Sequence, residues 1–81
     1  MRKLMILSIM NTEKQVVAQC DIVFSSEYGT GFELGGYDIA YKEQFENAFY
    51  LFTESISPRS EDSFIDPITK ELEGFWKFDL A

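Results

Sequence analysis

The fold is decided by residues 15–24, which read QVVAQCDIVF. Apolar residues occupy every second position and would share one face of an extended chain: Val16, Ala18, Cys20, Ile22 and Phe24. Gln15, Gln19 and Asp21 would point to the opposite face. This period of two predicts a β-strand with one buried face and one solvated face.

The preceding stretch predicts a second strand that pairs with the first. Residues 3–10 read KLMILSIM, an apolar run too short for a typical helix, and they favour a strand that is apolar on both faces. The polar residues 11–14, NTEK, separate the two runs. Residues 3–24 therefore predict a β-hairpin.

Glycine marks the segment that follows. Four of the five glycines of the chain lie between residues 25 and 36. Phe32 and Leu34 alternate with Glu33 there, a pattern that fits a short third strand and an ordered loop equally well.

A helix is predicted from Asp38, a good N-cap residue, to about Ser55. Ser57-Pro58 would end it, because the residue before a proline is displaced from the α region. Apolar residues recur at helical spacing on one stripe, which would pack on the sheet: Phe45, Ala48, Phe49, Phe52 and Ile56.

The C-terminal segment admits two structures after a polar connector at residues 59–63. Asp66, Pro67 and Gly74 could frame a two-turn helix. Alternatively, Asp66-Pro67 opens a turn between strands near Phe64 and at residues 75–80. We favour the hairpin, because eight helical residues without an apolar stripe gain little stability from packing.

These elements together predict a single α+β domain that spans residues 1–81. One main helix would pack on an antiparallel sheet of about four strands. The order along the chain is an N-terminal hairpin, a glycine-rich loop, the helix and a C-terminal hairpin. A second domain would have too little interior to be stable alone.

The charge of the chain narrows the class of partner. The chain contains fourteen acidic residues, seven Lys and Arg and no histidine, and its net charge is −7. Residues 21–81 hold thirteen of the acids and only four of the bases. Such a chain repels nucleic acid and lipid headgroups and attracts basic protein surfaces.

Catalytic chemistry finds little support in the sequence. Cys20 is the only cysteine, falls on the apolar face of its strand and has no histidine to activate it. Glu61, Asp62 and Asp66 lack the alternating ligand spacing of a calcium loop, and the glycines match no phosphate-binding fingerprint. We therefore expect a non-enzymatic protein with no catalytic residue, no metal and no cofactor.

The same features indicate a cytoplasmic protein. A lone cysteine forms no intramolecular disulfide, which is typical of a reducing compartment. The N-terminal apolar run ends by Met10, well short of the ~20 apolar residues that span a membrane. No small-residue cleavage site follows it, so a signal peptide is not predicted.

Acidic side chains collect on the predicted outer face of the helix. At 100° per residue, four residues lie opposite the apolar stripe and a fifth lies beside them: Glu43, Asn47, Tyr50 and Glu54, then Glu46. This surface fits an ordinary solvated face, and it also fits an acidic stripe with an aromatic anchor for a basic partner. Further acids would join it if the C-terminal turn lies near one end of the helix: Glu61, Asp62, Asp66, Glu71 and Glu73.

In size, charge and aromatic content the chain is similar to small acidic inhibitors. These include toxin-immunity proteins and the phage or plasmid anti-defence proteins that block nucleic-acid-handling systems. The similarity carries over no residue. It implies a protein-binding inhibitor or adaptor, a nucleic-acid mimic in charge, that occludes a basic surface of a nucleic-acid-handling protein or cationic toxin. Direct binding of nucleic acid is not expected.

The alternative hypothesis is a small structural subunit that self-associates. Trp76, Phe78 and Leu80 would lie on one face of an aromatic C-terminal strand. If that strand were at the sheet edge, it could pair with a second copy to form a homodimer. The inhibitor hypothesis is compatible with a monomer.

Overall fold

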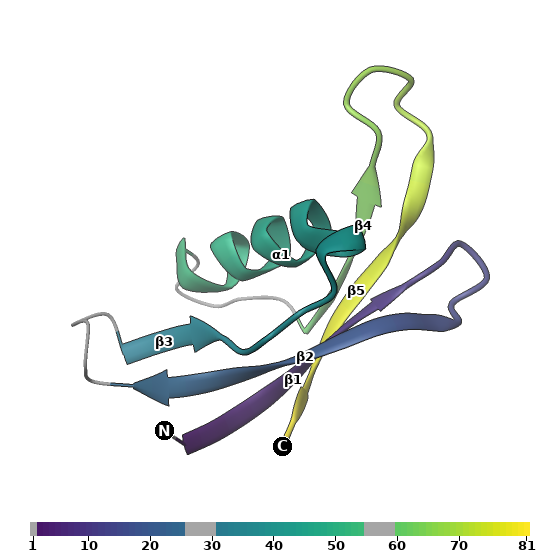
Figure 1. Cartoon of the computed structure of the whole chain (residues 1–81). Helices are drawn as coiled ribbons and strands as arrows, with labels where there is room; N and C mark the ends of the chain where they lie inside the picture. Colours follow the sequence, from purple (N-terminus) through teal and green to yellow (C-terminus); the bar gives the residue numbers. More distant parts are fainter. Residues whose placement is uncertain (1, 26–30, 55–59) are drawn as a thin grey trace.

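The computed structural model describes residues 2–25, 31–54 and 60–81. Five strands, one 3₁₀ turn and one α-helix follow each other along the chain (Figure 1): β1 (Arg2–Met10), β2 (Val16–Ser25), β3 (Gly31–Leu34), η1 (Ile39–Tyr41), α1 (Lys42–Glu54), β4 (Glu61–Ile65) and β5 (Leu72–Leu80). The predicted α+β class is confirmed.

All five strands join one antiparallel sheet in the order β3-β2-β1-β5-β4. The predicted number of about four strands is one too low, because the glycine-rich segment contributes a strand. β3 pairs with the end of β2 from Ile22↔Leu34 to Ser25↔Gly31. Gly31 has a φ of +85°, a left-handed backbone conformation that is strained for other residues.

The N-terminal hairpin is confirmed, and Asn11 explains its turn. β1 and β2 pair in the register Leu7↔Cys20. The Asn11 side-chain oxygen accepts hydrogen bonds from the backbone N–H groups of Glu13 and Gln15, at 3.0 and 2.9 Å. Such bonds let an asparagine organise a turn through its own side chain. Lys14 completes the turn with a φ of 61°.

The C-terminal hairpin is confirmed in place of the short helix. Asp66 accepts hydrogen bonds from the backbone N–H groups of Ile68 and Thr69, at 2.8 and 2.9 Å, and so closes the turn between β4 and β5. The polar connector predicted for residues 59–63 is wrong from Glu61 onward, because β4 begins there. Polar side chains suit this strand since it lies at the sheet edge.

Asp38 caps the helical segment as predicted. Its Oδ1 accepts a hydrogen bond from the backbone N–H of Ala40 at 2.9 Å. The first turn is 3₁₀, and α1 then runs from Lys42 to Glu54. Ser55, Ile56, Ser57 and Pro58, assigned above to the end of the helix, lie outside the described residues.

The core lies between α1 and one face of the sheet. Phe45 and Ala48 of the helix are fully buried, and Phe49 and Phe52 pack beside them. The sheet contributes buried residues from its three inner strands: Leu7, Ile9, Cys20, Ile22, Trp76 and Phe78. The predicted apolar stripe is therefore confirmed for the residues that the structure describes.

The helix lies obliquely to the strands, with its two ends over different hairpins (Figure 1). At its N-terminal end, Tyr41 lines a small crevice with Phe64 and Gly74 of the β4–β5 hairpin. At its C-terminal end, the Phe52 ring lies 5.7 Å from the Phe32 ring of β3, centroid to centroid. The N-terminal end of α1 is thus beside the C-terminal hairpin.

Gly74 is needed where β5 passes the end of β1. It is buried, and a Cβ there would collide with the backbone carbonyl of Met10. No described helix is long and apolar enough to cross a membrane.

Candidate protein-binding surface

The outer surface of α1 carries the acidic side chains that the helical spacing placed there. We call the exposed set the acidic face of α1: Glu43, Glu46, Tyr50 and Glu54. Tyr50 is 61% exposed in the midst of the three carboxylates, and Leu51 beside it is 50% exposed. Their exposure follows from the burial of Phe45 and Ala48 on the opposite side of the helix.

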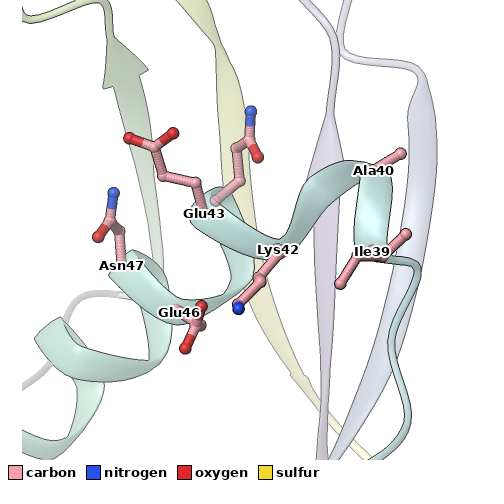
Figure 2. Close-up of a pocket in the computed structure, with 7 residues that line it drawn as sticks. Ile39, Ala40, Lys42, Glu43, Glu46 and Asn47 are labelled. Atoms are coloured by element: carbon pink, nitrogen blue, oxygen red, sulfur yellow. The ribbon is translucent and has the colours of Figure 1, made fainter.

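A shallow, open depression lies at the N-terminal end of this face (Figure 2). Its lining comes entirely from η1 and the first turns of α1: Ile39, Ala40, Lys42, Glu43, Gln44, Glu46 and Asn47. Figure 2 shows Glu43 and Asn47 on one side of the helix and Lys42 and Glu46 on the other. Ile39 is 76% exposed, so an apolar contact is available next to the carboxylates.

The acidic face of α1 carries few neutralising charges in the described part of the chain. None of the carboxylates of Glu43, Glu46 and Glu54 takes part in an ion pair there. Lys42 is the only basic residue between positions 31 and 54. It stands in the first turn of α1 and Glu54 in the last, so both are opposite in sign to the charge that the helix dipole favours. Glu43, also in the first turn, has the favoured sign, so the helix dipole accounts for Glu43 and not for Glu54.

The sheet face away from α1 holds its charges differently. We call it the open face. Its described charged residues include three ion pairs: Lys3–Asp21 at 3.4 Å, Lys14–Glu61 at 3.2 Å and Lys77–Asp79 at 3.6 Å. Among the described side chains, three of the five lysines are thus engaged on this face. Glu33, opposite Val23 in the β2–β3 register, lies on the same face without an ion pair among the described residues.

The structure separates Glu61 from the other predicted acids. In the β4–β5 register Glu61 is opposite Lys77, so its side chain lies on the open face, where it pairs with Lys14. The hypothesis that Glu61 shares one negative surface with the helix is therefore wrong. Side-chain direction alternates along a strand, and the error came from treating this residue as part of a connector.

Asp62 and Asp66 have structural surroundings. Asp62 is opposite Trp76, on the sheet face that α1 covers; it is half-buried and accepts a hydrogen bond from the backbone N–H of Ser63 at 2.8 Å. Asp66 caps the turn, and the backbone N–H groups of Thr69 and Ile68 hold its pKa below the ordinary 3.8. Both carboxylates have roles in shaping the hairpin.

Glu71 and Glu73 are exposed at the start of the β5 arm of the same hairpin. Glu73 lines the crevice that Tyr41 and Gln44 also line, so this part of the hairpin adjoins the N-terminal end of the helical segment.

The self-pairing surface predicted at the C-terminus is contradicted by the sheet order. β5 lies between β1 and β4 and is not an edge strand. Trp76 and Phe78 are buried in the core under α1, with ring centroids 5.0 Å apart. Leu80 is exposed, but it belongs to the part of β5 that pairs with Met5 of β1. The sequence could not reveal this, because strand order depends on contacts between distant segments.

Cys20 is a buried core residue. Burial, with a smaller contribution from the Asp21 carboxylate, raises the pKa of its thiol to about 11. The thiol is therefore protonated and weakly nucleophilic near neutral pH. Across residues 2–25, 31–54 and 60–81, no three His, Cys, Asp or Glu residues group closely enough to hold a metal ion.

Sequence reasoning missed an apolar cluster at the end of the C-terminal hairpin. Ile65 and Leu72 are cross-strand partners beside the turn, and Ile68 lies within it. All three side chains are exposed. The signal was the placement of Ile68 directly after Asp66-Pro67, since an apolar residue inside a polar turn has no core to enter.

In comparisons with known proteins, no family model, no curated protein and no solved structure matches this chain.

Proposed function

We propose that this protein is a non-enzymatic inhibitor or adaptor that binds a basic surface of a larger protein through the acidic face of α1. A surface that normally contacts nucleic-acid phosphates is the preferred target, because such surfaces concentrate Lys and Arg. Binding there would block access by occlusion and requires no chemical step. We place this action in the cytoplasm.

The segregation of charge carries the proposal. Three lysines are paired on the open face, while Glu43, Glu46 and Glu54 have no ion-pair partner among the described residues. Unpaired carboxylates grouped on one helix attract a basic partner and raise its association rate. Tyr50 and Leu51 add exposed apolar area within reach of those charges. Aromatic residues of this kind often supply much of the affinity in protein interfaces.

A capture experiment with matched charge variants tests the proposal. The wild-type protein and Glu43→Gln/Glu46→Gln/Glu54→Gln would serve as baits in host lysate, washed at low and at high salt. The control bait, Glu13→Gln/Glu33→Gln/Asp79→Asn, loses the same number of charges from outside α1. We expect a nucleic-acid-handling protein or cationic toxin that wild type and control retain at low salt and release at high salt.

The location of the lost charges decides the outcome. If the helix variant retains the same partner as wild type, the acidic face of α1 is not the binding surface. If the control loses the partner as fully as the helix variant, net charge alone governs binding and the proposed site is wrong.

A further inference from the structure

We propose that the tip of the β4–β5 hairpin is a second docking element, which inserts Ile65, Ile68 and Leu72 into an apolar pocket with a basic rim on a partner protein. We call these three residues the hairpin tip. The proposal goes beyond the proposed function, because it concerns a different surface and requires an apolar pocket as well as positive charge.

The three apolar side chains of the hairpin tip are all exposed. Ile68 is 89% exposed, Ile65 is 56% exposed and Leu72 is 44% exposed. Ile65 and Leu72 pair across the two strands, and Ile68 follows in the turn that they frame. Grouped apolar side chains that no core covers are typical of a contact surface.

The turn holds this apolar group in one shape. The backbone N–H of Asp66 donates to the carbonyl of Glu71, and that of Lys70 donates to the carbonyl of Asp66, both at 2.9 Å. The Asp66 carboxylate also accepts hydrogen bonds from the backbone N–H groups of Ile68 and Thr69, and Pro67 fixes its own φ. A preformed loop loses little conformational entropy on binding, which favours affinity.

The position of the hairpin suits insertion into a cavity. Figure 1 shows the end of β4–β5 extending away from α1 and from the other strands. The molecule is elongated, with extents of 39 × 23 × 21 Å. A projecting hairpin can enter a concave site that the broad surface of the helix cannot enter.

The charges around the hairpin tip identify the kind of pocket. Asp66, Glu71 and Glu73 stand beside it against a single base, Lys70. A rim of Lys or Arg on the partner would complement this surplus. The same surplus disfavours a second copy of this chain, whose net charge is −7, and an anionic lipid surface.

Two synthetic peptides provide the test by NMR titration of the isotope-labelled protein. The first is an amphipathic helical peptide of Leu and Lys, which presents an apolar surface bordered by positive charge. The second replaces every Leu by Ser and keeps the same Lys residues. We expect the Leu–Lys peptide to shift the backbone amide signals of the hairpin tip, whereas the Ser–Lys peptide shifts signals of α1 only.

Single substitutions assign the contact. Ile68→Ser should weaken binding of the Leu–Lys peptide at the tip by about tenfold. Burial of an isoleucine side chain at an interface increases affinity by roughly that amount. Leu80→Ser, at a comparably exposed apolar residue at the other end of β5, should leave that affinity unchanged. Both positions are exposed, so each variant should keep the wild-type unfolding midpoint.

The result that overturns the proposal is equally concrete. Unchanged affinity of Ile68→Ser, or shifts spread evenly over exposed apolar residues such as Ile39 and Leu80, would show that the tip is not a specific docking element. Concentration-dependent dimerisation lost in Ile68→Ser, or binding to phosphatidylglycerol vesicles, would assign the tip to a second copy or to a membrane and reject the pocket. Tip binding without any α1 response to the Ser–Lys peptide would remove the proposed function and keep this inference.

Discussion

The open face of the sheet and the outer surface of α1 both meet solvent, yet they hold their charges in different ways. On the open face, three lysines of the described residues form ion pairs with carboxylates at 3.2 to 3.6 Å. On α1, the carboxylates of Glu43, Glu46 and Glu54 stand without such partners in the described part of the chain. The outer surface of α1 therefore carries three carboxylates and the single base Lys42, without an ion pair in that part of the chain. Mixed charge suits a surface that only has to stay in water, whereas charge of one sign suits a surface that attracts a partner.

Since α1 packs on the opposite face, the open face is covered by polar side chains of the sheet itself. Ser8 at its centre is fully buried, and the Gln19 side chain donates a hydrogen bond to the Ser8 hydroxyl at 3.0 Å. On β5, Lys77 is the cross-strand neighbour of Ser8. Long polar side chains therefore cover the backbone here, because their apolar stems can lie over the sheet while their polar ends reach water.

The largest expected effect comes from removing the contact that holds α1 on its face of the sheet. Phe45 is fully buried and its ring lies 5.6 Å from that of Tyr37, centroid to centroid. Phe45→Ala should lower the free energy of unfolding by about 3–5 kcal/mol, because it removes a buried ring and leaves a cavity. Urea unfolding followed by Trp76 fluorescence would measure the change.

Tyr50 on the outer surface of the same helix is the matched control. Tyr50→Ala should change the free energy of unfolding by no more than about 0.5 kcal/mol, because the side chain is exposed. Equal losses for the two variants would mean that α1 does not have one buried and one outward face, and the comparison would fail.

A second prediction concerns the chemistry of the side that α1 covers. The Cys20 thiol, with its pKa raised to about 11 from an ordinary 9.0, should hold about a hundredfold less thiolate near neutral pH than an exposed cysteine. Its reaction with a disulfide reagent should be slower in the native protein by at least that factor and should become fast in urea. A native rate equal to the unfolded rate would place Cys20 outside the core.

The sign of the pH dependence follows from the same shift. Burial disfavours the charged thiolate of Cys20 in the folded protein. The contribution of this thiol to the free energy of unfolding is therefore fully present below pH 9 and is lost as the pH rises toward 11. Cys20→Ala should remove this part of the alkaline loss of stability. Unfolding midpoints of the two proteins at pH 8 and pH 10.5 would measure it.

The elements of this fold follow from local patterns, and their arrangement does not. Period-two alternation located the first hairpin, and the helical stripe correctly placed Phe45 and Ala48 in the core. Asp66-Pro67 identified the last turn for the same reason, because the chemistry of a turn is local. Strand order is set by pairings between distant segments, so the sequence misplaced Trp76 at an edge.

For the candidate site, too, the sequence predicted the directions of helical side chains but not those of strand side chains. The helical residues could be placed because every residue of a helix has a fixed direction relative to its stripe. Glu61 could not, because its direction depends on the residue at which β4 begins, and a one-residue shift reverses every side chain of a strand. Ile68 had a local signal, its place inside a polar turn, whereas the exposure of Ile65 and Leu72 depends on how far the hairpin extends beyond the core.

The smallest expected effect compares the same substitution, Glu to Gln, on the two surfaces. We expect the free energy of unfolding to change in opposite directions. Glu61→Gln removes an ion pair with Lys14, which also lies 4.8 Å from the centroid of the Phe75 ring. This variant should lower the free energy of unfolding by about 0.2–1 kcal/mol, a small value because both charged groups are largely exposed. Glu54→Gln should instead raise it by about 0.3–0.5 kcal/mol, because a negative charge in the last turn of a helix opposes the helix dipole. Both changes should shrink in 1 M salt if they are electrostatic. If both variants lower the free energy of unfolding by the same amount, Glu54 is a stabilising residue like Glu61. Its place on α1 would then be explained by stability, without a binding partner.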